Sequence, residues 1–232
     1  MTAELSPARQ LPLALKWPAS HKREDWIIAP GNEAGLSVAE GRMDIAAHAA
    51  AIYGPEGSGK THLAAIWAER VGATLLNLNG FAEDRVREVA EQGSVVIEDF
   101  DQYLATSSAD RRIEKALHHL YNVTAELGRQ MLLTGRDAPA RWPIQLPDLA
   151  SRLASVPAFK IGALDDASLH ALILKLFEQR GLLVGNGVAT YMVRRGTRGY
   201  KAIVEAVETL DAQNLQKQKP ITVPFVKEIL RW

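Results

Sequence analysis

Cysteine is absent from all 232 residues of the chain. Without it the protein has no disulfide framework, no catalytic thiolate and no zinc site built on thiolates, and a reducing intracellular setting fits the sequence. No apolar run approaches the roughly 20 residues that cross a bilayer, and the first residues lack the apolar core of a signal peptide. We therefore expect a soluble, cytoplasmic protein with no membrane partner.

An excess of charge is also absent. Lys and Arg together number 27, as do Asp and Glu, so the formal net charge is zero. Domains whose main task is to grip duplex DNA usually carry a basic excess, so the composition argues against that role. The length suits one large or two small domains and is sufficient for a real hydrophobic core.

What the sequence does contain is a phosphate-binding loop of the form G-x-x-x-x-G-K-[ST] over residues 54–61. An apolar run predicts a strand over 51–53 before it, and helical spacing predicts a helix over 61–71 after it. Glycines let backbone N–H groups curl around a phosphate, and the amino end of the helix faces the same anion with positive charge. Lys60 would reach the terminal phosphates, and the Thr61 hydroxyl would bind Mg²⁺.

The loop therefore predicts that the chain binds ADP or ATP together with Mg²⁺. Earlier in the chain, Ile27 and Ile28 precede a Pro-Gly turn, where they could lie against an adenine ring or in the core; the sequence by itself favours the core. The nucleotide-binding residues predicted at the loop are Gly54, Pro55, Glu56, Gly57, Ser58, Gly59, Lys60, Thr61 and His62.

An apolar strand that ends in acids, over residues 94–101, is the second part of a phosphate-loop site. The carboxyl end of such a strand brings a carboxylate beside the Mg²⁺ ion, a role that we assign to Glu98. The next acid, Asp99, would act catalytically by orienting a water molecule against the γ-phosphate. Acids after a strand are common, so the pattern is informative only because it follows the loop.

Apolar runs alternate with helical patterns through the first two thirds of the chain, which predicts a parallel α/β sheet with helices around it. We expect an α/β domain over residues 21–162 and, from the change to helical patterns only, a small all-helical domain over 163–232. The adjacent His118 and His119 point apart on a helix and are read as ordinary helix residues. Strands are expected at 51–53, 74–78, 94–101, 131–134 and 156–161, and helices at 36–51, 61–71, 82–92, from 107 or 108 to 127, 167–180, 188–195, 199–211 and 224–230, with a polar turn at 213–219.

Residues 1–20 form a tail of different character. Pro7, Pro12 and Pro18 prevent a helix, and residues 10–15 alternate apolar side chains in an extended pattern. An extended segment with leucines on one side is typical of a docking peptide. A terminus whose leucines pack on its own domain is the alternative, and the pattern leaves both open.

A parallel sheet with a phosphate loop, an acidic strand and a helical lid resembles the AAA+ ATPases. Finer matches point to the clade of replication initiators and, within it, to regulatory homologues of DnaA. The resemblance covers essentially the whole chain. It rests on His119-Leu120-Tyr121-Asn122, on Leu146-Pro147-Asp148-Leu149-Ala150-Ser151-Arg152-Leu153, on the ending over residues 221–230, and on Gln10-Leu11-Pro12-Leu13-Ala14-Leu15.

The resemblance implies an AAA+ domain with a five-stranded parallel sheet, a helical lid and several further roles. Arg152 would be an arginine finger that serves ATP bound by DnaA, and Arg198 or Lys201 would contact phosphate as the second sensor. The tail would bind the DNA polymerase sliding clamp (its beta subunit), so that DNA is contacted only through the clamp. The resemblance also implies that copies of the chain could assemble into a homo-oligomer. The clamp-binding residues would be Gln10, Leu11, Leu13 and Leu15.

Three positions depart from the pattern of the clade. Glu98 replaces the usual Asp, Arg136 occupies the first-sensor place, and the gap-free count puts Lys201 in the second-sensor slot. These changes favour a nucleotide-gated regulator over a vigorous ATPase. The main alternative is an autonomous AAA+ motor, such as a helicase loader, that uses its own Asp99 as catalytic base. A DNA-binding adaptor is a third reading, which would need a basic face.

Overall fold

The computed structural model describes residues 22–29, 31–42, 47–106, 111–196 and 199–232. The chain divides into two compact units, one within Ser20–Ser168 and one formed by Leu169–Trp232. The predicted clamp-binding residues of the tail lie outside the described residues. No helix of the described part is long and apolar enough to span a membrane.

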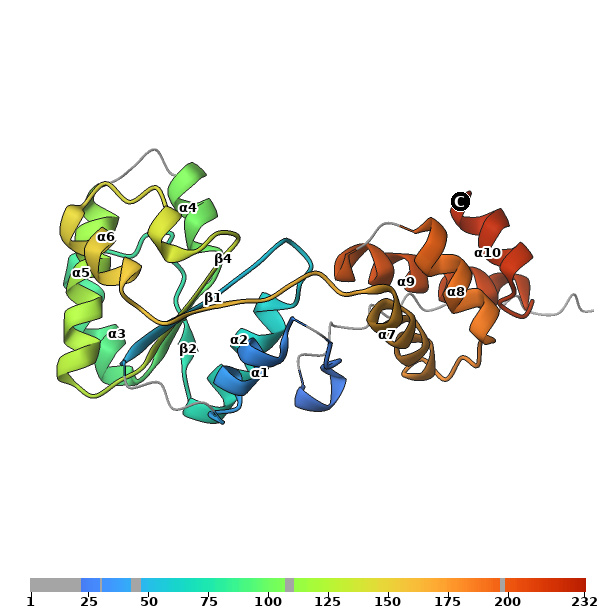
Figure 1. Ribbon diagram of the computed structural model, residues 1–232, viewed down its shortest axis with the longest axis horizontal. Coiled ribbons are helices and arrows are strands. Elements are labelled where there is room, and N and C mark those ends of the chain that lie inside the picture. The colour runs from blue at the N-terminus through green and yellow to red at the C-terminus, as the bar shows by residue number, and fades with distance from the viewer. Residues whose placement is uncertain (1–21, 30, 43–46, 107–110, 197–198) are drawn as a thin grey trace, which may run out of the picture. The chain divides into compact units, whose positions relative to one another are not determined.

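The first unit is built on a sheet of five parallel strands in the order β2-β3-β4-β1-β5, which confirms the expected sheet (Figure 1). The strands are β1 (Ala49–Tyr53), β2 (Thr74–Leu75), β3 (Val95–Ile97), β4 (Met131–Gly135) and β5 (Ala158–Lys160). The helices are α1 (Glu33–Ala39), α2 (Lys60–Val71), α3 (Val86–Gln92), α4 (Phe100–Thr106), α5 (Arg111–Glu126) and α6 (Pro147–Ala154). Short 3-10 turns lie at Arg23–Asp25, Glu83–Arg85 and Pro139–Arg141.

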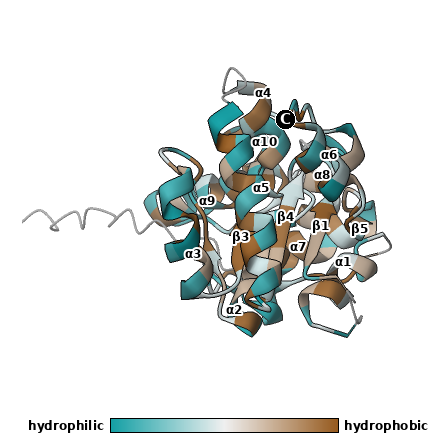
Figure 2. Cartoon of the chain, turned by 90° about the vertical axis from the view of Figure 1, so that its left-hand side faces the viewer, coloured by the Kyte–Doolittle hydropathy of each residue, from teal (hydrophilic) through white to brown (hydrophobic). Residues whose placement is uncertain are grey.

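Both faces of the sheet are covered by helices, and the side chains of the interior strands are accordingly apolar on both faces. Successive residues of a strand point to opposite faces, so a sheet buried on both sides needs continuous apolar strands. Ala49 and Ala51 pack with α3, α4, α5 and α6, while Ala50 and Ile52 pack with α1 and α2. Figure 2 shows the resulting hydrophobic colour on β1 and β3, behind helices whose outer faces are hydrophilic.

The structure corrects the expected helix over residues 36–51. Helix α1 ends at Ala39, and β1 begins at Ala49. Gly41 adopts a left-handed φ of 68°, a conformation that stops a helix. The alanines before the phosphate loop favour a helix by propensity, but pairing with β4 and β5 in the buried centre of the sheet overrides that preference.

Other boundaries also differ from expectation. The strand expected at 74–78 pairs only over Thr74–Leu75, and the acidic segment enters α4 at Phe100 directly after its acids. The expected turn at 213–219 is helical as far as Lys217, because its Gln, Lys and Leu residues are good helix formers; Gln218, at a φ of 50°, ends it.

The second unit is all-helical, as expected. It contains α7 (Asp166–Glu178, beginning just before the boundary), α8 (Asn186–Arg195), α9 (Tyr200–Lys217) and α10 (Val223–Leu230). The Arg180 side chain, 6% exposed, ties the end of α7 to α9 through Glu208 and Asp211. The core of this unit includes Leu172, Phe177, Met192, Val207, Leu210, Phe225 and Val226.

Candidate nucleotide site

The phosphate loop connects β1 to α2 at the carboxyl ends of the parallel strands, where ligands of open α/β sheets bind. The N–H of Gly54 donates to the carbonyl oxygen of Gly135 on β4 at 3.1 Å. Gly57 and Gly59 have φ values of 74° and 98°, which favour glycine. The loop thus begins tied to the sheet and then turns through two positions suited to glycine.

Gly54 lies where no side chain fits. A Cβ atom built there would be 2.1 Å from the backbone oxygen of Ile161, just beyond β5. We expect Gly54→Ala to lower the free energy of unfolding by about 2–3 kcal/mol, since overpacking forces backbone to shift. Chemical denaturation measures this change.

Gly187 provides a matched control for that substitution. It lies in the first turn of α8 with nothing within 4 Å of its added Cβ atom. Gly187→Ala should leave stability unchanged or raise it by up to about 1 kcal/mol, because alanine favours the helix. Equal losses in the two variants would show that the contact with Ile161 does not decide the effect.

Lys60 opens α2 and is buried, with 7% of its surface exposed. Its ammonium group donates to the carbonyl oxygens of Gly54 at 3.0 Å and Pro55 at 3.1 Å. Burial lowers the pKa of Lys60, and the nearby carboxylate of Asp99 works against that shift. A cation held in this way, within the loop, is suited to bind the terminal phosphates of a nucleotide.

Trp26 covers the loop, a contact that the sequence reasoning missed. A Cβ atom on Gly59 would be 2.6 Å from the indole ring, which also meets the ring of His62 edge-on at 5.2 Å. Of the two predicted adenine contacts, Ile27 is half-buried and Ile28 is 56% exposed. The only signal for this contact in the sequence is an aromatic residue shortly before the Pro-Gly turn, and such residues are common in hydrophobic cores.

Unsatisfied polar atoms gather at this site. The described part of the chain has four buried side-chain polar atoms without a hydrogen-bond partner, and three belong to Trp26, Ser58 and Glu98. Buried polar groups are nearly always paired, so each exception calls for an explanation. A polar ligand over the loop, such as a nucleotide with its metal ion, would supply partners for these atoms.

The acids that follow β3 are held in place by β4. The N–H of Asp99 donates to the Thr134 hydroxyl at 3.0 Å, and Asp99 itself has a φ of 47°. Non-glycine residues in this conformation are uncommon and concentrate at functional sites. The buried carboxylate of Asp101 accepts from the N–H groups of Arg136 and Asp137, which fixes the end of β4.

Arg136, in the first-sensor place, reaches across to the phosphate loop. Its Nη2 atom donates to Oε2 of Glu56 at 2.7 Å. Its positive charge lowers the pKa of Lys60, less strongly than burial does, so the two cations lie close enough to interact. Arg136 therefore lies beside the phosphate loop, where it forms an ion pair with Glu56.

A magnesium ion would find few protein ligands here. No group of three or more acidic or histidine side chains in the described ranges could hold a metal ion. Mg²⁺ usually keeps several waters and takes one or two protein oxygens plus those of substrate phosphates. The Thr61 hydroxyl and the unpaired Oε1 of Glu98 fit that sparse requirement.

Arg152 lies at the opposite edge of the sheet from the loop. It is exposed near the end of α6, shortly before β5 begins, and β5 runs parallel to β1. Its guanidinium lies 6.0 Å from the ring centroid of Tyr121, which contacts His48 just before β1. The phosphate loop follows the carboxyl end of β1. Because β1 has five residues and rises ~3.3 Å per residue, this end lies about 16 Å from the amino end of the strand, next to His48.

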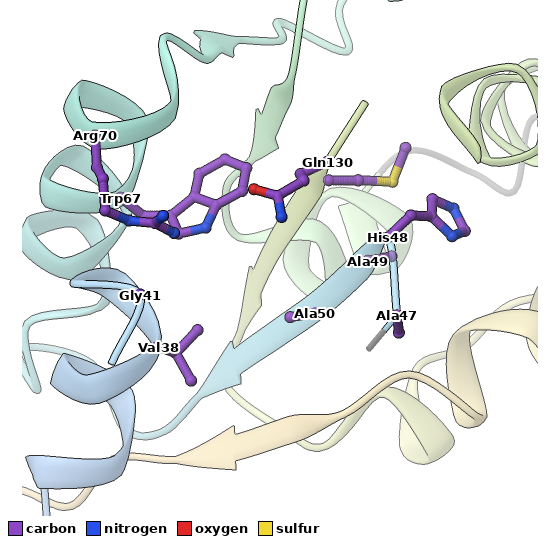
Figure 3. A pocket seen from close by; sticks show the side chains of 10 residues that line it. Val38, Gly41, Ala47, His48, Ala49, Ala50, Trp67, Arg70 and Gln130 are labelled. Carbon is purple, nitrogen blue, oxygen red and sulfur yellow. The ribbon is translucent and has the colours of Figure 1, made fainter. Parts of the chain in front are cut away.

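A separate pocket of about 230 Å³ also opens at this amino edge, between α1, α2 and the strands (Figure 3). Trp67 and Arg70 line one side, and His48 at the start of β1 lies on the other, its ring turned away from them. The pocket lies at the amino ends of the strands, whereas the phosphate loop follows the carboxyl end of β1, so the pocket is distinct from the candidate nucleotide site.

The predicted second-sensor residues belong to the second unit. Arg198 lies outside the described residues, and Lys201 is exposed in the first turn of α9. Their predicted contact with phosphate stays a prediction.

Comparisons with known proteins agree on the fold. Residues 165–230 match the family model described as "Hda, lid domain". Domain III of the replication initiation protein DnaA from Thermotoga maritima is similar with a TM-score of 0.76 and 18% identity, over 94% of this chain and 98% of that chain.

Two further structures are similar at lower coverage. AMPPCP-bound DnaA from Aquifex aeolicus has a TM-score of 0.69 and 18% identity, over 87% of this chain and 69% of that chain. The Holliday junction branch migration motor RuvB from Thermotoga maritima has a TM-score of 0.60 and 13% identity, over 86% and 66%. Residues 165–230 therefore match an Hda lid domain, and the chain has the fold of domain III of DnaA.

Proposed function

We propose that this protein is a nucleotide-bound regulator of replication initiation that stimulates hydrolysis of ATP bound to DnaA and so inactivates the initiator. The observation that carries the proposal is the position of Arg152. It is exposed at the edge of the sheet away from its own phosphate loop, so any phosphate it serves belongs to another molecule. The Hda lid and the DnaA-like fold favour DnaA as that molecule.

The chemistry is that of an arginine finger. A guanidinium group beside the γ-phosphate stabilises the charge on the transferring group and contributes ~10³–10⁵ in rate in other phosphoryl-transfer systems. Its planar, permanently charged fork matches phosphate oxygens better than an ammonium group does. Arg152 would thus complete a site that DnaA alone stabilises poorly.

The chain's own site would hold ADP or ATP as a structural ligand. Lys60 and the loop N–H groups would bind the phosphates, and Thr61 with Glu98 would hold Mg²⁺, which neutralises phosphate charge when bound. Arg136 is paired with Glu56, and Glu98 is longer than the usual Asp. Both features favour weak intrinsic hydrolysis.

An autonomous ATPase motor is the second candidate. Asp99 supports it, because the acid follows β3 in the place of a catalytic base and is fixed by Thr134. ATP turnover measured without DnaA or clamp separates the two functions: a motor turns over rapidly alone, whereas the regulator does not.

The decisive test of the proposal is hydrolysis of DnaA-bound ATP, reconstituted with clamp-loaded DNA, with and without this protein. We expect hydrolysis to accelerate only when the protein is present. The same rate in both reactions would refute the proposed function. Omitting the clamp in a third reaction measures how much of the effect depends on tethering.

The tail should bind the clamp independently of the nucleotide. We expect Gln10→Ala combined with Leu13→Ala to abolish retention by an immobilised sliding clamp, because an extended peptide depends on a few side-chain anchors. Nucleotide affinity, measured by calorimetry, should stay unchanged. A doubly substituted chain that still binds the clamp would place the docking peptide elsewhere.

A further inference from the structure

Helix α5 contacts α6, the helix that carries Arg152, near both of its ends. At the first end, the Glu114 side chain is buried, with the residue 1% exposed. Its carboxylate accepts from the N–H of Gln145 at 3.1 Å and from that of Leu146, the N-cap of α6, at 2.6 Å. A carboxylate at the amino end of a helix satisfies free N–H groups and complements the helix dipole, so Glu114 anchors the start of α6.

At the second end, the ring of Tyr121 lies beside Arg152. Tyr121 follows Glu114 by two helical turns and therefore lies on the same side of α5. The guanidinium carbon of Arg152 is 6.0 Å from the ring centroid, within the range of a cation–π interaction. The arginine thus leaves α6 over an aromatic surface that belongs to the neighbouring helix.

His48 in turn supports Tyr121. Its Nε2 atom is 3.0 Å from the backbone oxygen of Tyr121, and the two rings meet edge-on with centroids 4.3 Å apart. Burial lowers the pKa of His48, so the ring is neutral near pH 7 and does not repel Arg152. Figure 3 shows His48 directly before β1, an interior strand, which connects this support to the sheet.

We propose that Tyr121 is a positioning residue for Arg152, held by His48, while Glu114 fixes the helix on which the arginine stands. The inference deepens the proposed function and rests on it. A free arginine side chain occupies many rotamers, and a partner's phosphate would have to select one of them at an entropic cost. An aromatic surface beneath the guanidinium reduces that cost before the partner arrives.

The test compares Tyr121→Phe with Tyr121→Leu in the reconstituted hydrolysis of DnaA-bound ATP. Phenylalanine keeps the ring and should keep the maximal rate. Leucine removes the cation–π contact and should lower the maximal rate about two- to fivefold, the range expected of an exposed contact. The half-saturating concentration of this protein should not change, because the surface that binds the partner is intact.

Several outcomes would overturn the positioning role. Equal losses with Phe and Leu would assign the effect to the hydroxyl group. A raised half-saturating concentration with an unchanged maximal rate would make Tyr121 a contact with the partner. Thermal unfolding verifies that each variant is folded, and Tyr121→Met replaces the leucine variant if that one is unstable.

Arg152→Ala in the same assay separates this inference from the proposed function. If Arg152→Ala abolishes stimulation while Tyr121→Leu keeps the full rate, only the positioning role fails. If Arg152→Ala leaves stimulation intact, the finger itself fails, and the positioning role fails with it.

Discussion

Arg152→Ala is expected to reduce the stimulated hydrolysis of DnaA-bound ATP by at least about 10³-fold, the lower range of an arginine finger. The side chain is exposed and makes no hydrogen bond within the described part of the chain, so its loss should leave the fold intact. Nucleotide binding should also be retained, because the phosphate loop lies at the other edge of the sheet. Single-turnover hydrolysis of labelled ATP on DnaA measures the rate.

Arg129→Ala is the matched control. Arg129 is exposed just before β4, at the same edge of the sheet, and its removal changes the net charge by the same amount. A general electrostatic effect on association would slow both variants alike, whereas a finger would slow only the Arg152 variant. Arg152→Lys should recover part of the rate, since an ammonium group keeps the charge but lacks the planar fork.

The sequence predicted the parts of the site that depend on local pattern. A phosphate loop brings its own strand and helix, because the glycines, the lysine and the hydroxyl residue work only in that order. The acids after β3 follow from the same logic, and the five-stranded parallel sheet is confirmed. The helical character of the C-terminal unit also follows from periodicity alone.

The sequence could not predict contacts between distant segments. Trp26 reaches Gly59, and Glu114 accepts from the N–H of Leu146, the N-cap of α6, which follows it by more than thirty residues. The prediction of a helix over residues 36–51 was wrong for the same reason. The alanines of β1 form a strand because they pair with neighbouring strands inside the sheet, although alanine favours a helix. Arg152 was singled out by family resemblance, whereas its distance from its own loop follows from the parallel direction of β1 and β5, since it precedes β5 and the loop follows β1.

Lys60→Met is the second substitution with a large expected effect. Lys60 is buried in the loop, and its loss removes charge-assisted hydrogen bonds to phosphate that contribute roughly 1.5–3 kcal/mol each. With two such bonds, affinity for ADP and ATP should fall by about 100-fold or more. Isothermal calorimetry measures the affinity, and Lys160→Met, at an exposed lysine on β5, should leave it unchanged.

The same substitution should not weaken the fold in the absence of nucleotide. Burial lowers the pKa of Lys60 below its ordinary value of 10.5, so the folded state binds the proton less tightly than the unfolded state does. The charge therefore costs stability at every pH below the folded-state pKa, and this cost is relieved as the pH rises from there to 10.5. In Lys60→Met both the cost and its pH dependence disappear.

Thermal unfolding at pH 7 and pH 10, without nucleotide, tests this expectation. The substituted protein should unfold at the same temperature as the parent or higher at pH 7, and the difference should shrink at pH 10. A clear loss of stability at pH 7 would mean that the bonds from Lys60 to the carbonyls of Gly54 and Pro55 outweigh its desolvation. Stability kept while affinity is lost would instead identify Lys60 as a residue maintained for its ligand.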